Sequence, residues 1–426
     1  MPFAKRTLIF LICTLYLTAY GQDDSDQAIL ESVSFTGLHK TKEAYILDLL
    51  DPELGSSISE AQIESYLQVL KNLPSVAQAD HHIERIDNRL SITYEVTERA
   101  TALPIINFGG IRGNIWFSLG VTENNFRGLG DVFLGFYQNN NGRHSGQLLY
   151  RNPRILDSDW GYSFSINKWS SVEPVFFSEG TVDYYYDNNG VGLSILRNIG
   201  LRNQVEVGGT YFVESYEKTE FQLLETPPGP FDFSLNKFLT KTEFRMNYLD
   251  YHFFYIQGHE SILTYQNVLN LDDRTWFNSL QLQTKLFLRP NKKLNLAFRL
   301  RMAISTNEDS PFAPFVVDSH VNIRGVGNRI DRGTAQAILN VEARRTIYHK
   351  RFLSSQLVIF ADSGTWRNPG GELKDLFNPD QFRQFVGLGF RINYQRVFGA
   401  SLRVDYGIDI YNLEQRGFVI GLGQYF

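Results

Sequence analysis

The chain has 426 residues and a formal net charge of −5 at pH 7, and it contains 33 phenylalanines, 22 tyrosines and one cysteine. The acidic balance excludes the basic footprint of a nucleic-acid-binding protein. The single cysteine, Cys13, excludes an internal disulfide and a cysteine-based metal site. Beyond the first 21 residues no apolar run approaches the ~18 residues of a membrane-spanning helix. Many aromatic residues without such a run favour β-structure in which apolar and polar side chains alternate.

Residues 1–21 have the features of a secretory signal peptide. Lys5 and Arg6 precede an apolar stretch from Thr7 to Thr18, and Ala19-Tyr20-Gly21 resembles a cleavage site with small outer residues. The apolar stretch is too short to span a membrane. We therefore expect an exported protein that loses this segment together with its only cysteine.

Residues 27–98 are predicted to form a small α+β domain. Thr41 can cap a first helix over Lys42–Leu50, and Ser59 with Gln62 has the spacing of a capping box for a second helix. Three strands complete an expected β-α-α-β-β order. They are the segment AILESVSFTG, Val76–Ile83 and Leu90–Glu98.

This segment resembles a polypeptide-transport-associated (POTRA) domain. The resemblance rests on VSFTG near its start, Leu73-Pro-Ser-Val76 after the second helix and LSITYEVTE at its end. It implies a sheet edge to which an extended client polypeptide adds a strand through backbone hydrogen bonds. An unrelated α+β module is the alternative. The candidate edge is Val76–Ile83, with the residues Val76, Gln78, Asp80 and His82.

Residues 105–426 alternate between apolar and polar side chains almost throughout. In 275–304, leucines and other apolar residues face one way, whereas Ser, Gln, Lys, Asn and Arg side chains face the other. This is the lipid-out, water-in pattern of a membrane barrel. A soluble β-sandwich would also alternate, but strands of ten or more residues exceed the ~5–6 of globular sheets and suit a tilted membrane crossing. The sequence therefore predicts a transmembrane β-barrel.

About sixteen such segments can be counted, an even number as in bacterial outer-membrane barrels. With the N-terminal domain in the periplasm, the first strand runs outward. The segments 139–142 and 289–293 then become periplasmic turns, whereas 218–237 and 305–332 become outer loops. The expected strands begin near residues 115, 130, 142, 161, 176, 190, 202, 238, 252, 275, 292, 333, 352, 383, 399 and 417.

The 28-residue loop 305–332 contains an arginine next to a glycine. Sixteen strands leave a wet lumen into which such a loop could fold. Gly325 could supply the positive φ of a tight reversal. Arg324 would then need a carboxylate, because an unpaired charge is costly in a narrow lumen. Asp362 is the first candidate and Glu342 the second; a solvated surface-loop arginine is the alternative.

Two motifs, Ile323-Arg324-Gly325 and Phe360-Ala361-Asp362-Ser363-Gly364, look like signatures of the BamA/TamA outer-membrane assembly superfamily. The resemblance covers nearly all of residues 27–426. It implies that Arg324 locks against Asp362 inside the barrel, with Gly325, Phe360 and Gly364 completing the motifs. Val326 departs from the aromatic residue that usually follows the glycine. Further runs similar to those of the superfamily are 124–130, 150–154 and 403–407.

The segment Arg416–Phe426 resembles the C-terminal recognition signal of outer-membrane barrels, from which Gln424 departs. The superfamily resemblance also implies a weakly paired seam between the strands 115–122 and 418–426 that opens sideways to client strands. An open seam would expose backbone groups that lipid cannot satisfy and an incoming strand can. An equal alternative is that the seam glycines make room for lumen aromatics. The candidate seam residues are Ser118, Gly421, Gly423 and Phe426.

Three function classes remain open on the sequence. They are an outer-membrane protein insertion or assembly factor, a secretion translocator for an unfolded exoprotein, and a passive pore or structural barrel. One POTRA domain is fewer than the several of a central assembly machine or the two of two-partner translocators. The G-x-S-x-G motif of a fused phospholipase is missing, and none of the eight histidines has ligand or triad spacing.

We therefore expect a protein of the Gram-negative outer membrane with its POTRA domain in the periplasm. No enzymatic activity, cofactor or metal is expected. The expected partners are outer-membrane lipid, nascent or unfolded β-barrel or exported clients, and possible periplasmic accessory proteins, but no nucleic acid.

Overall fold

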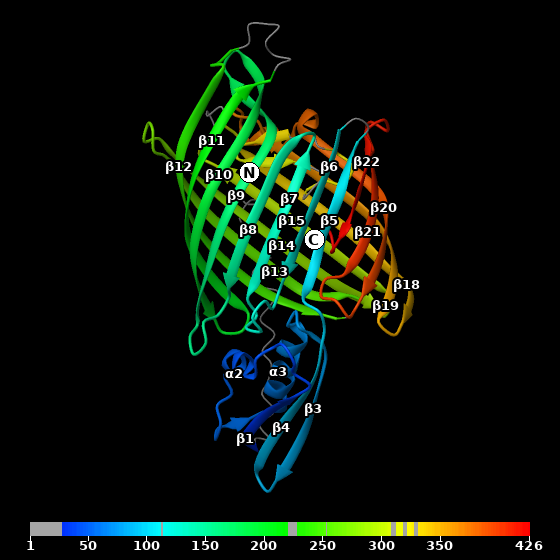
Figure 1. The fold of residues 1–426 in the computed structure, drawn as a ribbon. Helices are drawn as coiled ribbons and strands as arrows, with labels where there is room; N and C mark the ends of the chain where they lie inside the picture. Colours follow the sequence, from blue (N-terminus) through cyan, green and yellow to red (C-terminus); the bar gives the residue numbers. More distant parts are fainter. Residues whose placement is uncertain are drawn as a thin grey trace, which may run out of the picture.

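The computed structural model describes residues 28–111, 114–219, 228–252, 254–307, 312–317, 322–327 and 331–426. The predicted signal peptide lies outside these residues. The described chain forms a small N-terminal domain and a barrel, with the domain at one open end of the barrel (Figure 1). No helix in the described residues is long and apolar enough to cross a membrane.

The N-terminal domain packs two helices on a four-stranded sheet of order β2-β1-β4-β3. Its helix α3 begins at the capping box that Ser59 and Gln62 form, and its buried face includes Ile63, Leu67 and Leu70. The strand β3 is an edge of the sheet because it pairs with β4 alone. The elements are β1 (Ala28–Thr36), α2 (Glu43–Leu50), β2 (Ser57–Ile58), α3 (Glu60–Asn72), β3 (Val76–Ile86) and β4 (Arg89–Glu98).

Sixteen antiparallel strands of the described chain close into a barrel, which confirms the predicted fold class. The first half of the barrel is β5 (Ala102–Ile111), β6 (Asn114–Glu123), β7 (Val132–Asn140), β8 (Arg143–Asn152), β9 (Trp160–Phe177), β10 (Gly180–Ile199), β11 (Asn203–Lys218) and β12 (Asp232–Tyr251). The second half is β13 (Ile256–Asn270), β14 (Trp276–Asn291), β15 (Leu294–Ser305), β18 (Ala335–Lys350), β19 (Leu353–Arg367), β20 (Phe382–Tyr394), β21 (Ser401–Asp409) and β22 (Arg416–Leu422).

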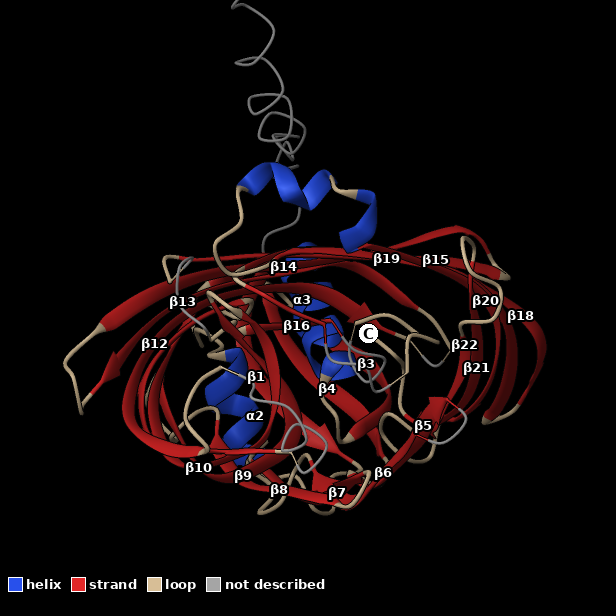
Figure 2. Ribbon diagram, turned by 90° about the horizontal axis from the view of Figure 1, so that it is seen from above, coloured by secondary structure: helices blue, strands red, loops and turns tan. Residues whose placement is uncertain are grey.

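Shorter elements accompany the barrel. The strands β16 (Phe315–Val317) and β17 (Asp331–Gly333) pair with each other and not with the wall. Figure 2 shows β16 and the end of the chain inside the ring of strands. Two 3₁₀ turns, η2 (Leu373–Phe377) and η3 (Pro379–Gln381), connect β19 to β20.

The two faces of the wall differ in polarity, as the period-two pattern predicts. On the outer face, Leu193, Ile359 and Leu388 are each more than 60% exposed. On the inner face, Arg299 and Asn295 are 3% exposed although they share a strand with exposed Leu300 and Met302. The barrel is therefore apolar outside and polar inside, which is the reverse of a water-soluble protein.

The sequence missed one strand and divided another. The first barrel strand is β5, which lies before the predicted start at 115, and the predicted strands at 176 and 190 are the single strand β10. Pro104 and the Gly109-Gly110 pair weaken the strand signal of β5. The letters DNNG at 187–190 resemble a turn, but in the structure they lie mid-strand and pair on both sides. The two errors cancel, so the count of sixteen is correct.

Because β5 was missed, the sequence analysis assigned the opposite direction across the membrane to the strands from β6 to β9. The chain enters β5 at the domain end, and the loops that follow β6 and β8 and the last residues of β12 contact the domain. The turn between β7 and β8 therefore lies at the far end, and the prediction that 139–142 lies on the domain side is wrong. The domain contacts are Arg154 to Asp48, Asn125 to Thr41 and Asn72 to Asp250, with N–O distances of 2.7, 3.0 and 3.1 Å.

Candidate functional site

The segment 322–327 lies in the barrel lumen and presents Arg324 to the wall. The Arg324 guanidinium forms a fork with Asp362 of β19, in which Nε lies 2.8 Å from Oδ2 and Nη2 lies 2.9 Å from Oδ1. The backbone N–H of Arg324 also donates to Asp362 Oδ2 at 3.0 Å. Both side chains are fully buried. The geometry fixes the position and the direction of the segment, because a planar guanidinium meets both carboxylate oxygens.

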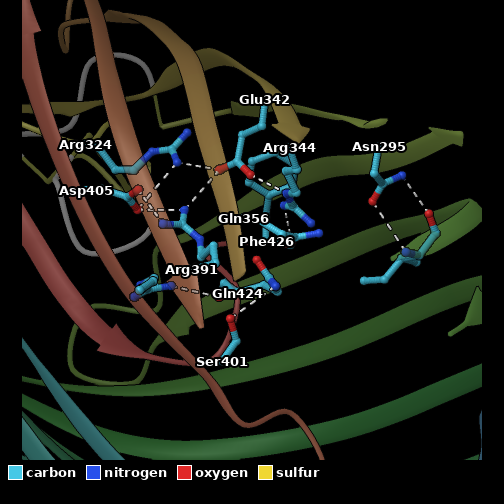
Figure 3. A network of polar contacts seen from close by, with 12 residues as sticks. Asn295, Arg324, Glu342, Arg344, Gln356, Arg391, Ser401, Asp405, Gln424 and Phe426 are labelled. Carbon is cyan, nitrogen blue, oxygen red and sulfur yellow. Dashed lines mark hydrogen bonds and ion pairs between the residues drawn. The ribbon is translucent and has the colours of Figure 1, made fainter. Parts of the chain in front are cut away.

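Further charges surround this fork (Figure 3). Arg324 Nη1 contacts Glu342 of β18 and lies 3.6 Å from Asp405 of β21. Arg391 of β20 forms a second fork with Asp405, with N–O distances of 2.6 and 2.9 Å. Arg344 Nε lies 2.6 Å from Glu342 Oε2. Three buried arginines thus face three buried carboxylates, so the cluster balances the charges whose burial would otherwise be costly.

Two aromatic rings enclose the guanidinium of Arg324. Its Cζ atom lies 3.7 Å from the centroid of the Phe360 ring and 4.5 Å from that of Tyr425. Guanidinium groups are attracted to ring faces at such distances. Phe360 comes from the same strand as Asp362, whereas Tyr425 follows β22. The tail after β22 therefore contacts the loop arginine directly.

Glycines let the loop tip approach the wall closely. Gly325 has φ +99°, and a Cβ there would lie 2.7 Å from the Gly407 carbonyl oxygen. A Cβ at Gly364 would lie 2.5 Å from Ile323 Cδ1. Val326, which follows this glycine in place of the aromatic residue that the resemblance implied, is buried in a cluster with Ile323. A smaller apolar residue thus suffices for packing at the tip.

We refer to Arg324, Asp362, Glu342, Asp405 and Phe360 as the inner lock. The structure brings together the predicted Arg324, Gly325, Glu342, Phe360, Asp362 and Gly364. Sequence reasoning assigned no role to Asp405 or Arg391. The alternation of β20 and β21 directs both side chains into the lumen, and Asp405 also lies in the run 403–407 that resembles the superfamily. These two features of the sequence could have identified the residues. Tyr425 was missed because the chain was expected to continue as a strand.

The seam between the last and first strands is the shortest ladder in the described barrel. Only Phe418–Gly421 of β22 have register partners on β5, at Gly110–Asn107. At Gly423 the chain turns with φ +95° and leaves the wall. In the described residues, the part of β5 from Ala102 to Ile106 has ladder partners on β6 alone. Five residues of β5 thus present an open edge at the domain end.

Three of the four predicted seam residues are misplaced. Ser118 lies on β6, one strand away, because β5 and not the strand at 115 is the first barrel strand. Gly423 and Phe426 follow the end of β22, and Phe426 lies in the lumen, where its ring is 5.0 Å from Arg299 Cζ. Gly421 is the predicted residue that lies in the seam, opposite Asn107.

A cavity of about 360 Å³ borders the open edge of β5. Leu103 of β5 lines it together with residues of the tail, the domain linker and the far wall. Its lining mixes aromatic and polar side chains, including Tyr251, Phe398, Gln424 and Phe426. A cavity of this composition can hold part of an unfolded polypeptide, whose side chains are also mixed in polarity.

In the N-terminal domain, the predicted client residues lie on the edge strand β3. Gln78, Asp80 and His82 are exposed, whereas Val76 is buried. The carbonyl of Ala77 accepts a hydrogen bond from Gln395 of the barrel at 3.2 Å. The start of the edge is therefore in contact with the barrel. No cluster of His, Cys, Asp and Glu in the described residues has a geometry that could hold a metal ion.

No family model matches the chain, and no curated protein matches its sequence. Among solved structures, BamA from Haemophilus ducreyi lacking POTRA domains 1–3 matches with a TM-score of 0.53 and 15% identity, over 93% of this chain and 84% of that one. CdiB from Acinetobacter baumannii matches with a TM-score of 0.59 and 13% identity, over 94% and 74%. CdiB from Escherichia coli matches with a TM-score of 0.60 and 10% identity, over 94% and 77%.

This chain has the fold of BamA and CdiB. The expected likeness to the BamA/TamA superfamily is thereby confirmed at the level of the fold. Identities of 10–15% carry no detail of the site, so the inner lock and the seam rest on the geometry given above.

Proposed function

We propose that this chain is a non-enzymatic outer-membrane protein of a Gram-negative bacterium that inserts client polypeptides into the membrane through the β22–β5 seam. The observation that carries the proposal is the four-pair seam beside an open edge of β5. In a bilayer, unpaired backbone groups of a strand cannot bond to lipid. A client strand that pairs with β5 would satisfy them, and the cavity beside Leu103 would hold the chain that follows.

The apolar outer face of the barrel supports the membrane location. Exposed leucines and isoleucines cover it on strands from both halves of the barrel. In water such a surface would aggregate, whereas in lipid it is solvated.

We further propose that the N-terminal domain is a POTRA domain in the periplasm. Its exposed edge β3 offers backbone donors and acceptors beyond Ala77 to an extended client. Because the domain contacts the barrel beside the start of β5, a client bound at β3 would be close to the seam.

A disulfide across the seam tests the proposal. Phe108 and Ile420 are register partners, so cysteines at both positions suit a bridge between neighbouring strands. In a Cys13→Ser background, the oxidised Phe108→Cys/Ile420→Cys pair should abolish insertion of an unfolded eight-stranded barrel into proteoliposomes, and reductant should restore it. The matched control is Ile195→Cys/Val207→Cys, which joins β10 to β11 far from the seam. Normal insertion with the seam sealed would overturn the proposal.

A secretion translocator is the second candidate, and the polar lumen favours it. Charged side chains such as Glu206, Arg151 and Glu260 line the inner wall and would suit a hydrated polypeptide. Passage along the lumen needs movement of the loop but no opening of the seam. The same oxidised pair therefore separates the two functions, since secretion through the lumen would continue with the seam sealed.

A further inference from the structure

Three segments at the domain end of the barrel carry positive charge and no negative charge. They are 286–294, which joins β14 to β15, 343–353, which joins β18 to β19, and 394–400, which joins β20 to β21. None of them contains an aspartate or a glutamate. Apart from the lumen-facing Arg344, their arginines and lysines form what we name the basic rim: Arg289, Lys292, Lys293, Arg345, Lys350, Arg351 and Arg396.

The three segments of the basic rim are in contact with one another. The backbone N–H of Thr346 donates to the Lys293 carbonyl at 2.8 Å, and that of Gln395 donates to the Phe352 carbonyl at 3.0 Å. Arg396 Cζ lies 4.4 Å from the centroid of the Phe352 ring. Figure 1 shows the turn between β18 and β19 at the end of the barrel that carries the N-terminal domain, but to one side of that domain. The rim is therefore a continuous surface that the domain leaves open.

The register of β18 and β19 directs the central cations of the rim outward. Arg345 pairs with Leu357, and Lys350 pairs with Leu353. Partners in an antiparallel ladder point to the same face, and both leucines are exposed on the outer face of the barrel. Tyr348, between the two cations, is also exposed, as aromatic residues at the boundary of a membrane are. Arg345 and Lys350 thus face the lipid side of the wall, where a polypeptide in the lumen cannot reach them.

These cations have no carboxylate to neutralise them. Within the described ranges, Arg345, Lys350 and Arg351 form no ion pair. Lys374, which is equally accessible in the connection between β19 and β20, bonds Glu372 at 3.0 Å. A positive charge beside lipid is unfavourable unless an anion is close to it. The anion for the basic rim must therefore come from outside this chain.

The opposite end of the same part of the barrel has the opposite charge. The connections there are 271–275 between β13 and β14, 368–381 between β19 and β20, and 410–415 between β21 and β22. Together they contain six carboxylates and two cations. An anionic ligand would be attracted to the domain end and repelled from the far end. The two ends of the wall thus distinguish the two leaflets of a membrane.

We propose that the basic rim binds the phosphate groups of anionic phospholipids in the periplasmic leaflet, with Arg345 and Lys350 at its centre. A guanidinium meets two phosphate oxygens at once, and an ammonium group adds a point charge. The acyl chains of the same lipid would lie along the exposed Ile347 and Leu357. This inference rests on the membrane location and orientation given under the proposed function, and it adds a ligand that the seam does not require.

Native mass spectrometry of the full chain in detergent measures lipid binding directly. The protein is titrated with dioleoylphosphatidylglycerol, and in parallel with dioleoylphosphatidylcholine, which has no net charge. Arg345→Gln/Lys350→Gln should weaken the binding of the first phosphatidylglycerol about 30-fold, because each cation at a headgroup surface contributes a factor of about five. Binding of phosphatidylcholine should not change. Salt should weaken the binding of phosphatidylglycerol to the wild type more than to the variant.

Two further variants separate the site from the total charge and from the fold. Arg274→Gln/Lys374→Gln removes two exposed cations from the far end of the barrel and should bind phosphatidylglycerol as the wild type does. Arg345→Lys/Lys350→Arg keeps both charges in place and should stay within about threefold of the wild type. Thermal unfolding in lipid-free detergent should be the same for all variants, because the changed side chains are exposed.

Two results would overturn the inference. One is equal affinity for phosphatidylglycerol in the wild type and in Arg345→Gln/Lys350→Gln, which would leave the rim to an acidic protein surface instead of lipid. The other is an equal loss in Arg274→Gln/Lys374→Gln, which would mean that binding follows the total charge alone. The lipid titration needs no client, and the seam disulfide can be tested in vesicles of phosphatidylcholine alone. Failure of either proposal is therefore visible without the other.

Discussion

The ladder between β9 and β10 and the ladder between β22 and β5 belong to one closed barrel but differ greatly in length. The first has eighteen register pairs and the second has four. Every second pair of an antiparallel ladder exchanges two backbone hydrogen bonds. Lipid cannot replace these bonds, so the long ladder resists separation much more than the short one. Ladder length therefore identifies where a closed barrel can open without unfolding. The predictions below test whether the seam side differs from the β9–β10 wall as this comparison requires.

The largest effect is expected from Arg324→Ala, which removes the inner lock from the seam side. Asp362 and Glu342 would remain buried without their shared arginine, and loss of one partner of a buried ion pair costs about 3–5 kcal/mol. Thermal unfolding in detergent should occur at lower temperature, and bilayer conductance should rise. Arg143→Ala removes a partly exposed pair on the opposite wall and should cost less than about 1 kcal/mol. Equal effects would break the comparison.

The next largest effect is expected from Gly325→Ala. Alanine at φ +99° is strained, and its Cβ would approach the Gly407 backbone, which cannot move aside easily. The backbone strain and the close contact together should lower the free energy of unfolding by about 2–4 kcal/mol. Gly142→Ala is the matched control, because Gly142 has φ +83° with open space around it. It should show the backbone cost alone, about 1 kcal/mol, in the same unfolding measurement.

A smaller effect is expected from alanine in the seam itself. A Cβ at Gly421 would lie 2.0 Å from Asn107 Oδ1, so the Asn107 side chain must turn away and the seam should loosen by about 1 kcal/mol. In the wall, a Cβ at Gly190 would have its nearest contact at 3.1 Å. Cysteine labelling at position 108 should become faster in Gly421→Ala and should not change in Gly190→Ala. Equal labelling rates would show that the seam is no looser than the wall.

The smallest effect concerns pH and the base of β5. Burial alone would raise the pKa of Glu98, but hydrogen bonds from Thr41 and from the backbone of Lys40 outweigh it and hold the pKa below its ordinary value of 4.5. A lowered pKa stabilises the domain above pH 4.5, and this contribution is lost as the pH falls through the lowered pKa.

Glu98→Gln should therefore lower the unfolding temperature of the domain at neutral pH and reduce its decline in acid. Glu84→Gln changes an exposed carboxylate of the same domain and should do neither. If acid destabilised the wild type and Glu98→Gln equally, Glu98 would have no part in the pH dependence.

The contacts that the sequence could predict are those marked by a short motif or by the alternation of side chains between the two faces of a strand. The alternation along the strand directs Ile359 and Ala361 to the lipid and therefore Asp362 to the lumen. Arg324 requires a carboxylate partner, and Asp362 was the first candidate. The network beyond them depends on register between strands that are distant in sequence. Arg324 meets Asp405 only because β18 to β21 pair with specific offsets, and no local pattern fixes those offsets.

The strand errors have a different physical origin. Turn propensity is a local preference, and the sequence DNNG at 187–190 has it strongly. In β10 the neighbouring strands on both sides supply ladder bonds. The polar side chains of the segment also have partners, since Asn188 on the lumen face donates to Tyr186 and Asp187 on the outer face accepts from Arg143. Pairing with neighbouring strands thus overrides the local turn preference. A strand in a barrel wall pairs on both sides, whereas a strand in an isolated hairpin pairs on one side only.

The strands β10 and β12 each have 20 residues, whereas roughly 9–11 suffice to cross a tilted bilayer. The surplus of about ten residues, at ~3.3 Å each, extends these strands by roughly 30 Å. Figure 1 shows their tips rising above the rest of the rim, at the end away from the N-terminal domain. With the N-terminal domain in the periplasm, as proposed, the tips of β10 and β12 would project from the outer side of the membrane farther than the rest of the barrel.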